Sequence, residues 1–134
     1  MANRWFQQYV FGLEKYPVRL QFKLQATGTQ TGNSPQTIVR AKGLTSVTAA
    51  ATGLWTLTLD DAYNALLGYD VGFQSKDGAT APLNVDAFVL SETVASTKTI
   101  VVQLLGGTNG STATAPAAND IVFIELVLSN SSAV

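Results

Sequence analysis

Two adjacent carboxylates, Asp60 and Asp61, are the residues of this chain whose chemistry best suits general acid and base work. Acids that act together on a substrate approach it from separate positions, and sequence neighbours rarely converge on one atom. Asp60 also suits the N-cap of a short helix, because its side chain can accept a hydrogen bond from a free backbone N–H. We therefore expect a structural role for this pair and no catalytic one.

Three further aspartates, Asp70, Asp77 and Asp86, carry the oxygen ligands that Ca²⁺ prefers. Their spacing is not that of a calcium-binding loop, and Asp77 is followed by Gly78, a pair typical of a tight turn. We expect neither a metal nor another cofactor.

Nucleophilic catalysis lacks its usual partners here, because the chain has no histidine and no cysteine beside its 16 threonines and 9 serines. A serine activated by lysine would need Lys76 or Lys98, and both occur in polar, turn-like sequence. The glycines at 106, 107 and 110 lack the lysine and the helix of a phosphate-binding loop. These patterns predict a protein that is not an enzyme.

The composition predicts one domain that is partly covered by other protein. The chain has 134 residues, of which 46% are hydrophobic and only 13% charged, about half the usual charged fraction. No apolar run approaches the ~20 residues of a membrane span, and the first residues lack a signal-like apolar stretch. We expect a cytosolic product with no secretion signal of its own and no membrane partner.

Charge is distributed unevenly along the chain. Residues 1–42 carry six basic residues and one acid, whereas residues 43–134 carry two basic residues and eight acids. These charges either disperse over the folded surface or provide complementarity between subunits or with a lattice. The basic residues alternate along strands and do not cluster, so we expect no nucleic-acid partner.

Residues 1–16 form a candidate N-terminal arm. They hold five of the twelve aromatic residues, and their apolar positions recur at spacings of three and four, typical of a helix. Gly12 and the Tyr16-Pro17 step weaken a helix, so an extended arm is the alternative. The arm either packs over its own domain or anchors to another protein, as exposed aromatics often do. The residues expected to bind a partner are Arg4, Trp5, Phe6, Tyr9 and Phe11.

Residues 17–134 have the two-residue period of β-strands and predict a single β-sandwich domain. The expected strands are 18–25, 36–42, 44–48, 54–59, 69–75, 83–91, 97–105 and 120–129. Of these, 36–59 is expected to be a meander, 83–105 a hairpin, and the very apolar 120–129 a central strand. One short helix is expected over 60–68, with Tyr63, Leu66 and Leu67 as its buried stripe, and long loops are expected over 26–35 and 106–119. Trp55 fits the core better than an exposed sugar-stacking platform.

Three stretches carry a resemblance to a known class of proteins: MANRWFQQ at the start, IVRAKG at 38–43, and GLWTLTLDDAY at 53–63 continuing to LLG at 66–68. Together they resemble small structural proteins of tailed bacteriophages, and specifically capsid decoration, or cement, proteins. The resemblance covers residues 1–73. It implies an all-β, antiparallel β-sandwich or jelly-roll-like fold that oligomerises on the outer capsid surface and clamps neighbouring major capsid subunits.

Two functions are therefore expected. The first is a non-enzymatic virion protein that binds and stabilises the capsid lattice as a homo-oligomer, with the major capsid protein or another virion protein as its partner. The alternative is a carbohydrate-binding or adhesin-like module of a phage tail or fibre, suggested by the Thr/Ser-rich strands and the two tryptophans.

Overall fold

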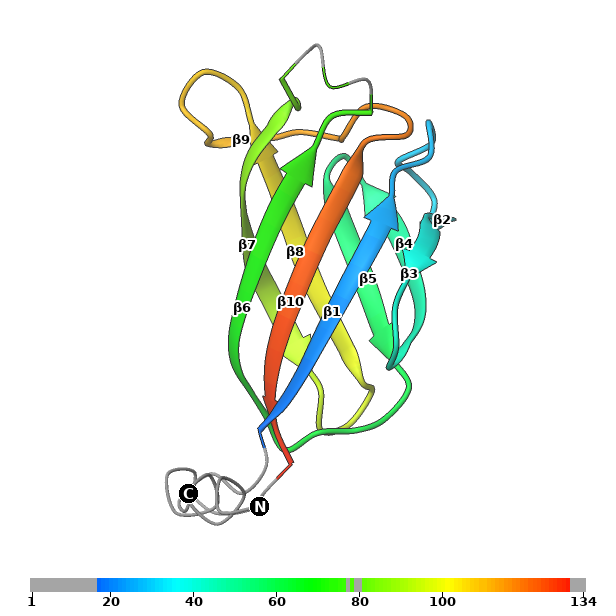
Figure 1. Cartoon of the computed structure of the whole chain (residues 1–134), viewed down its shortest axis with the longest axis vertical. Helices are drawn as coiled ribbons and strands as arrows, with labels where there is room; N and C mark the ends of the chain where they lie inside the picture. Colours follow the sequence, from blue (N-terminus) through cyan, green and yellow to red (C-terminus); the bar gives the residue numbers. More distant parts are fainter. Residues whose placement is uncertain (1–16, 77, 79–80, 131–134) are drawn as a thin grey trace, which may run out of the picture.

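In the part of the chain that the structure describes, ten β-strands form two antiparallel sheets that pack face to face (Figure 1). The computed structural model describes residues 17–76, 78 and 81–130, and in this part of the chain it contains no helix. Among these residues, nothing forms a helix of the length and hydropathy needed to cross a membrane. The expected antiparallel β-sandwich is confirmed, and the candidate arm, residues 1–16, lies outside the described residues.

The first sheet has four strands in the order β3-β1-β10-β6. Their bounds are β1 (Val18–Gln25), β3 (Thr37–Arg40), β6 (Ala65–Gln74) and β10 (Ile121–Ser129). β10 pairs with β1 on one side from Ile121 to Leu128 and with β6 on the other from Ile121 to Ser129, so the most apolar strand is central, as expected.

The second sheet has the order β2-β4-β5-β8-β7, and β9 also pairs with β8. Its strands are β2 (Ser34–Pro35), β4 (Leu44–Ala51), β5 (Leu54–Leu59), β7 (Asn84–Thr93), β8 (Thr99–Gly106) and β9 (Thr112–Ala113). The hairpin predicted over 83–105 is confirmed as β7 and β8. The meander over 36–59 is wrong, because β3 pairs with β1 in the opposite sheet and only β4 and β5 form a hairpin. The expected loop over 106–119 contains the short β9.

The core lies between the sheets and follows the two-residue period of the strands. Every second residue of β5 and β8 is buried, as is every second residue of β10 from Val122. Inward residues of β1 and β4 meet them from both sheets. The largest fully buried side chains are Trp55, Leu24, Leu57, Leu59, Ile100, Leu104, Ile124, Leu126 and Leu128. Strong alternation in these strands therefore fixes which face of each is inside.

The helix expected over 60–68 does not form. Its second half belongs to β6, in which Leu66 pairs with Leu128 of β10. In its first half, the N–H of Tyr63 donates to the carbonyl of Val94 at 2.9 Å and that of Asn64 to Ser129 at 2.9 Å. A helix of one or two turns satisfies few of its own backbone groups, whereas these long-range partners satisfy them at once. Tyr63 is buried as expected, but as part of the sandwich.

Candidate functional site

The residues predicted to bind a partner all belong to the arm: Arg4, Trp5, Phe6, Tyr9 and Phe11. They lie outside the described residues, so their role stays a prediction. The structure does place the point where the arm joins the sandwich, since Val18 pairs with Leu128, and Leu128 pairs with Leu66. In Figure 1 the start of β1 and the end of β10 lie at the same end of the sandwich. The arm therefore joins the domain two strands away from the first residues of β6.

Asp60 and Asp61 lie in an exposed turn between β5 and β6. The Asp60 carboxylate accepts a hydrogen bond from the Thr45 hydroxyl at 2.6 Å, and the Asp60 carbonyl accepts one from the Lys98 ammonium at 3.1 Å. Burial raises the pKa of the nearby Tyr63 hydroxyl, and the charges of Asp61 and Asp60 raise it further. Asp60 thus has a structural partner at this turn, although it caps no helix.

Of the aspartates considered as calcium ligands, Asp70 and Asp86 belong to different sheets. Asp70 is exposed on β6, where it pairs in register with Glu125 of the same sheet. Asp86 belongs to β7 of the other sheet, and its carboxylate accepts the N–H of Ala87 at 2.8 Å. Asp77 lies outside the described residues. No group of three or more acids, histidines or cysteines that could hold a metal ion occurs within the described ranges.

Trp55 is fully buried, as expected, and it anchors a polar network that the sequence did not reveal. Its indole N–H donates to Gln30 Oε1 at 2.8 Å, and Gln30 Nε2 donates to Gln36 Oε1 at 2.9 Å. Gln36 Oε1 also accepts the N–H of Thr27 at 2.9 Å. Gln30 and Gln36 are 8% and 6% exposed, so these bonds fix the 26–36 loop onto the core. An aromatic ring held in this way is not available to stack on a sugar.

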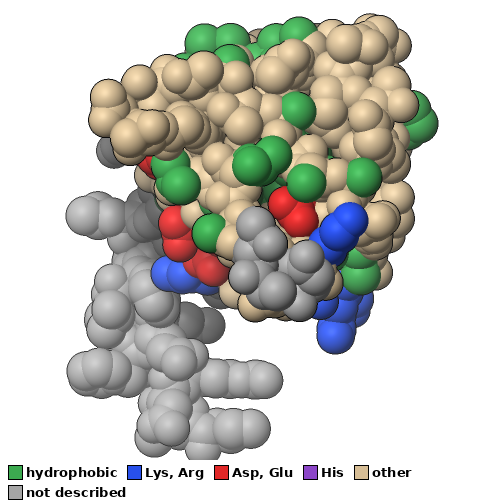
Figure 2. All heavy atoms as spheres, turned by 90° about the horizontal axis from the view of Figure 1, so that it is seen from above, with side chains coloured by type: hydrophobic (Ala, Val, Ile, Leu, Met, Phe, Trp, Pro, Cys, Tyr) green, Lys and Arg blue, Asp and Glu red, His purple; other side chains and the backbone are tan. Residues whose placement is uncertain are grey.

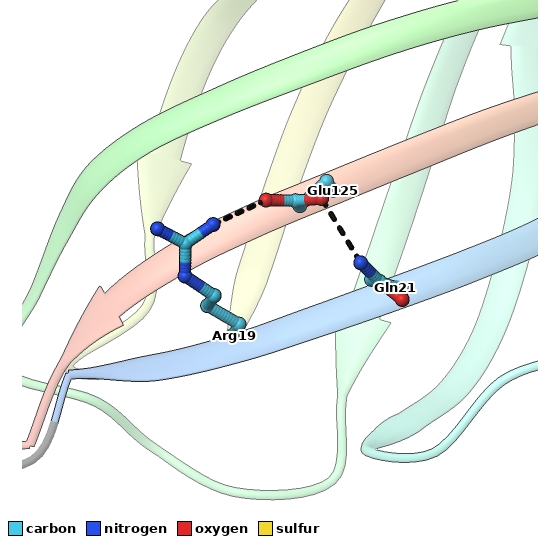
Figure 3. A network of polar contacts seen from close by, with 3 residues as sticks. All are labelled: Arg19, Gln21 and Glu125. Carbon is cyan, nitrogen blue, oxygen red and sulfur yellow. Dashed lines mark hydrogen bonds and ion pairs between the residues drawn. The ribbon is translucent and has the colours of Figure 1, made fainter.

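The outer face of the four-stranded sheet carries a band of charged and polar side chains. Figure 3 shows Glu125 of β10 bridging two residues of β1: it accepts from Arg19 at 2.9 Å and from Gln21 at 3.1 Å. Two residues along the same pair of strands, the Lys23 ammonium lies 5.8 Å from the centre of the Phe123 ring, within cation–π range. In Figure 2, which views the loop end of the sandwich, charged side chains gather along one side of the molecule. This face is suited to a polar contact.

A different surface lies where the two sheets meet at β6 and β7. Each is an edge strand with one strand partner in the described chain, β10 for β6 and β8 for β7, and the two strands contact each other (Figure 1). We call their exposed large hydrophobic side chains the β6–β7 edge surface. It consists of Leu67 (49% exposed), Tyr69 (44%), Val85 (61%), Phe88 (38%) and Leu90 (56%). It holds five of the nine exposed large hydrophobic side chains among the described residues.

Three members of this surface project because the strands bulge there. The register shifts leave Leu67 without an opposite residue on β10, and leave Val85 and Leu90 without opposite residues on β8. An extra residue in a strand breaks the alternation of inward and outward side chains and re-aims its own side chain. Leu67, expected in the buried stripe of a helix, is therefore exposed. Nothing in the local sequence marks these bulges, since each is set by pairing with a distant strand.

This surface can bury apolar area against a partner. Side chains that bulge outward from an edge also hinder the addition of a further strand, so contact there involves side chains more than backbone. Comparison of the chain with models of protein families, with curated proteins and with solved structures found no match.

Proposed function

We propose that this chain is a non-enzymatic structural component of a tailed-phage virion: a decoration protein that binds the capsid lattice as an oligomer and stabilises it. The observation that carries the proposal is the β6–β7 edge surface. A folded sandwich with a filled core leaves five large hydrophobic side chains exposed on two adjoining strands. Clustered apolar side chains on the surface of a soluble domain are typical of protein–protein contacts.

Two features of the sequence support this assignment. The resemblance to phage decoration proteins covers residues 1–73, which include the arm and the strands β1 to β5. The arm concentrates aromatic residues, the side chains that most often anchor protein interfaces. Many weakly bound copies on one lattice act together, so each contact needs only modest affinity. The partner in this proposal is the major capsid protein or another virion protein, and the site of action is the outer capsid surface.

Two observations argue against the carbohydrate-binding alternative. One of the two tryptophans behind it, Trp55, is buried and hydrogen-bonded to Gln30. The exposed aromatic on the outer face of the four-stranded sheet, Phe123, has the Lys23 ammonium beside its ring. We expect a glycan array to show no binding. A specific glycan ligand would favour the carbohydrate-binding function over the lattice function.

The test of the proposed function is binding to capsids assembled without the chain, from the virus that encodes it. Full-length protein and a variant lacking residues 2–16 are incubated with these capsids, which are then sedimented and analysed for bound copies. We expect the full-length chain to bind at a fixed number of copies per capsid and to raise the temperature at which the capsid opens. We expect the truncated variant to lose most of its occupancy.

A matched control separates the aromatic side chains from the length of the arm. In this variant Trp5, Phe6, Tyr9 and Phe11 are all changed to Ala while all 134 residues remain. Occupancy as low as that of the truncated variant assigns binding to the aromatic residues. Unchanged occupancy in both variants would refute docking through the arm, and absence of binding by the full-length chain would refute the lattice function itself.

A further inference from the structure

The two strands that carry the β6–β7 edge surface also carry acids and no basic residue. The sequences of the two strands, ALLGYDVGFQ and NVDAFVLSET, contain Asp70, Asp86 and Glu92 and no basic residue. All three acids are exposed. An occupant that fits this surface therefore combines large apolar side chains with positive charge.

Residues 1–16 of this chain have that combination. They contain five aromatic residues, with Arg4 and Lys15 against the single acid Glu14. Among the described residues, Ile38 and Val39 on β3 form the other pair of adjacent exposed large hydrophobics. That pair is followed by Arg40 and Lys42, which would repel a basic segment. Charge therefore favours the β6–β7 edge surface over the β3 edge as the site for the arm.

The place where residues 1–16 join the sandwich also favours this surface. Val18 pairs with Leu128, and Leu128 pairs with Leu66. The start of β1 therefore lies level with the start of β6, with only β10 between them. Two strand spacings are about 10 Å. Sixteen residues span up to about 50 Å when extended, or about 24 Å as a helix. The segment is long enough to reach the edge of its own sandwich or that of an adjacent copy.

We propose that residues 1–16 dock on the β6–β7 edge surface, with the aromatic side chains against Leu67, Tyr69 and Leu90 and the basic residues near the exposed acids. This inference rests on the arm being a binding segment, as in the proposed function, and it names the surface that receives it. When the segment comes from a neighbouring copy, the contact links subunits and accounts for the oligomer. The bulges at Leu67 and Leu90 supply the projecting side chains that the aromatic residues would cover.

The first test measures how far the surface protects the segment from trypsin, which cleaves after Arg4 and Lys15. The test variant carries Leu67→Gln and Leu90→Gln, and the matched control carries Val39→Gln, at a position with 47% exposure on the opposite edge. Removing two half-exposed leucines from the contact is expected to speed cleavage at both sites about tenfold or more. The control is expected to cleave like the unchanged protein. Equal cleavage in all three proteins would overturn the proposal.

The second test uses the absence of natural cysteine, which makes introduced pairs unambiguous. Trp5→Cys is combined with Leu90→Cys, or with Val39→Cys as the control, and disulfide formation under mild oxidation is followed on non-reducing gels. We expect the Leu90 pair to form a disulfide at least tenfold faster. This test reads the proximity of the two positions directly, so it decides the proposal even where the glutamine variant fails to fold. Equal rates for the two pairs would overturn it.

The two proposals fail in different ways. Protection from trypsin and cross-linking at Leu90 would support the docking surface. If capsid occupancy also survives removal of residues 2–16, the arm's role on the lattice is refuted. Loss of occupancy without protection or cross-linking would keep that role and refute the docking surface. A product of twice the chain mass whose disulfide maps to position 5 of one copy and position 90 of the other identifies a segment from a second copy. A product of single mass identifies docking within one copy, and both outcomes support the surface.

Discussion

The close approach of Gly106 to its neighbours allows a quantitative test of the packing of the end of β8 against Leu83 and Thr114. A Cβ atom at residue 106 would lie 2.3 Å from the carbonyl oxygen of Leu83, 2.7 Å from Thr114 Oγ1 and 2.9 Å from Thr114 Cβ, all under the 3.0 Å that real Cβ atoms keep. The nearest of these atoms is backbone, so a rotamer change cannot relieve the clash. Gly106→Ala must push the segment at Leu83 away from the end of β8.

Overpacking of this kind costs about 1–3 kcal/mol of unfolding free energy. For a domain of this size, 1 kcal/mol corresponds to roughly 4 °C in Tm, so we expect Gly106→Ala to lower Tm by roughly 4–12 °C. The matched control is Gly72→Ala in β6, where the nearest atom, Phe123 Cβ, would lie at an ordinary contact distance of 3.9 Å. The control is expected to leave Tm unchanged or to raise it slightly, because alanine restricts the unfolded chain more than glycine does.

The assay is thermal unfolding followed by circular dichroism, with urea unfolding at 25 °C as a second measure of the same free energy. Both variants make the same chemical change in a strand, so the difference between them isolates the local space. A Gly106→Ala variant that melts within about 1 °C of Gly72→Ala would refute the reasoning. It would mean that the segment at Leu83 can move away at negligible cost.

Three further predictions follow from the polar contacts. Trp55→Phe leaves Gln30 Oε1 without its indole donor in the core, so urea unfolding should show a loss of about 2–4 kcal/mol; a loss below about 1 kcal/mol would contradict a structural role for the bond. The pKa of Tyr63 is raised above 10.0 in the folded state, so the folded protein favours the protonated hydroxyl. This preference contributes fully to the unfolding free energy below pH 10, and the contribution is lost as pH rises through the pKa of the folded state. Tyr63→Phe should therefore flatten the decline in unfolding free energy above pH 10, and an unchanged slope would argue against the shift. Arg19→Ala should cost less than about 1 kcal/mol, since Arg19 is 68% exposed in its pair with Glu125, and a larger loss by urea unfolding would show that the surface network is stronger than expected.

Much of the fold could be predicted from the sequence because strong alternation is a local property. The strands β1, β5, β8 and β10 were expected close to their observed positions, as was the burial of Trp55. The short helix over 60–68 was not correct, because its apolar spacing and cap-like Asp60 fit a helix locally while Leu66 finds its partner at Leu128, 62 residues away in sequence. A local preference for helix is overridden when distant strands satisfy the hydrogen bonds of the same backbone groups.

The candidate site could be predicted only in part. The aromatic and basic character of residues 1–16 is visible in the sequence, and so is their value as an anchor. The β6–β7 edge surface is not visible, because Leu67, Val85 and Leu90 look like members of ordinary alternating or helical patterns. Each becomes an exposed residue only through a bulge against β10 or β8.

By itself, the sequence determined that this chain folds as β-strands around an apolar core, that it lacks histidine and cysteine, and that its aromatic residues and positive charge gather at the front. These properties depend on residue type and on spacing over a few positions. Only the tertiary structure decided that β3 joins the sheet opposite β4, and that β6 and β7, from different sheets, lie against each other. The physical reason is that strand pairing and register are set by contacts between residues far apart in the chain, which no local pattern specifies.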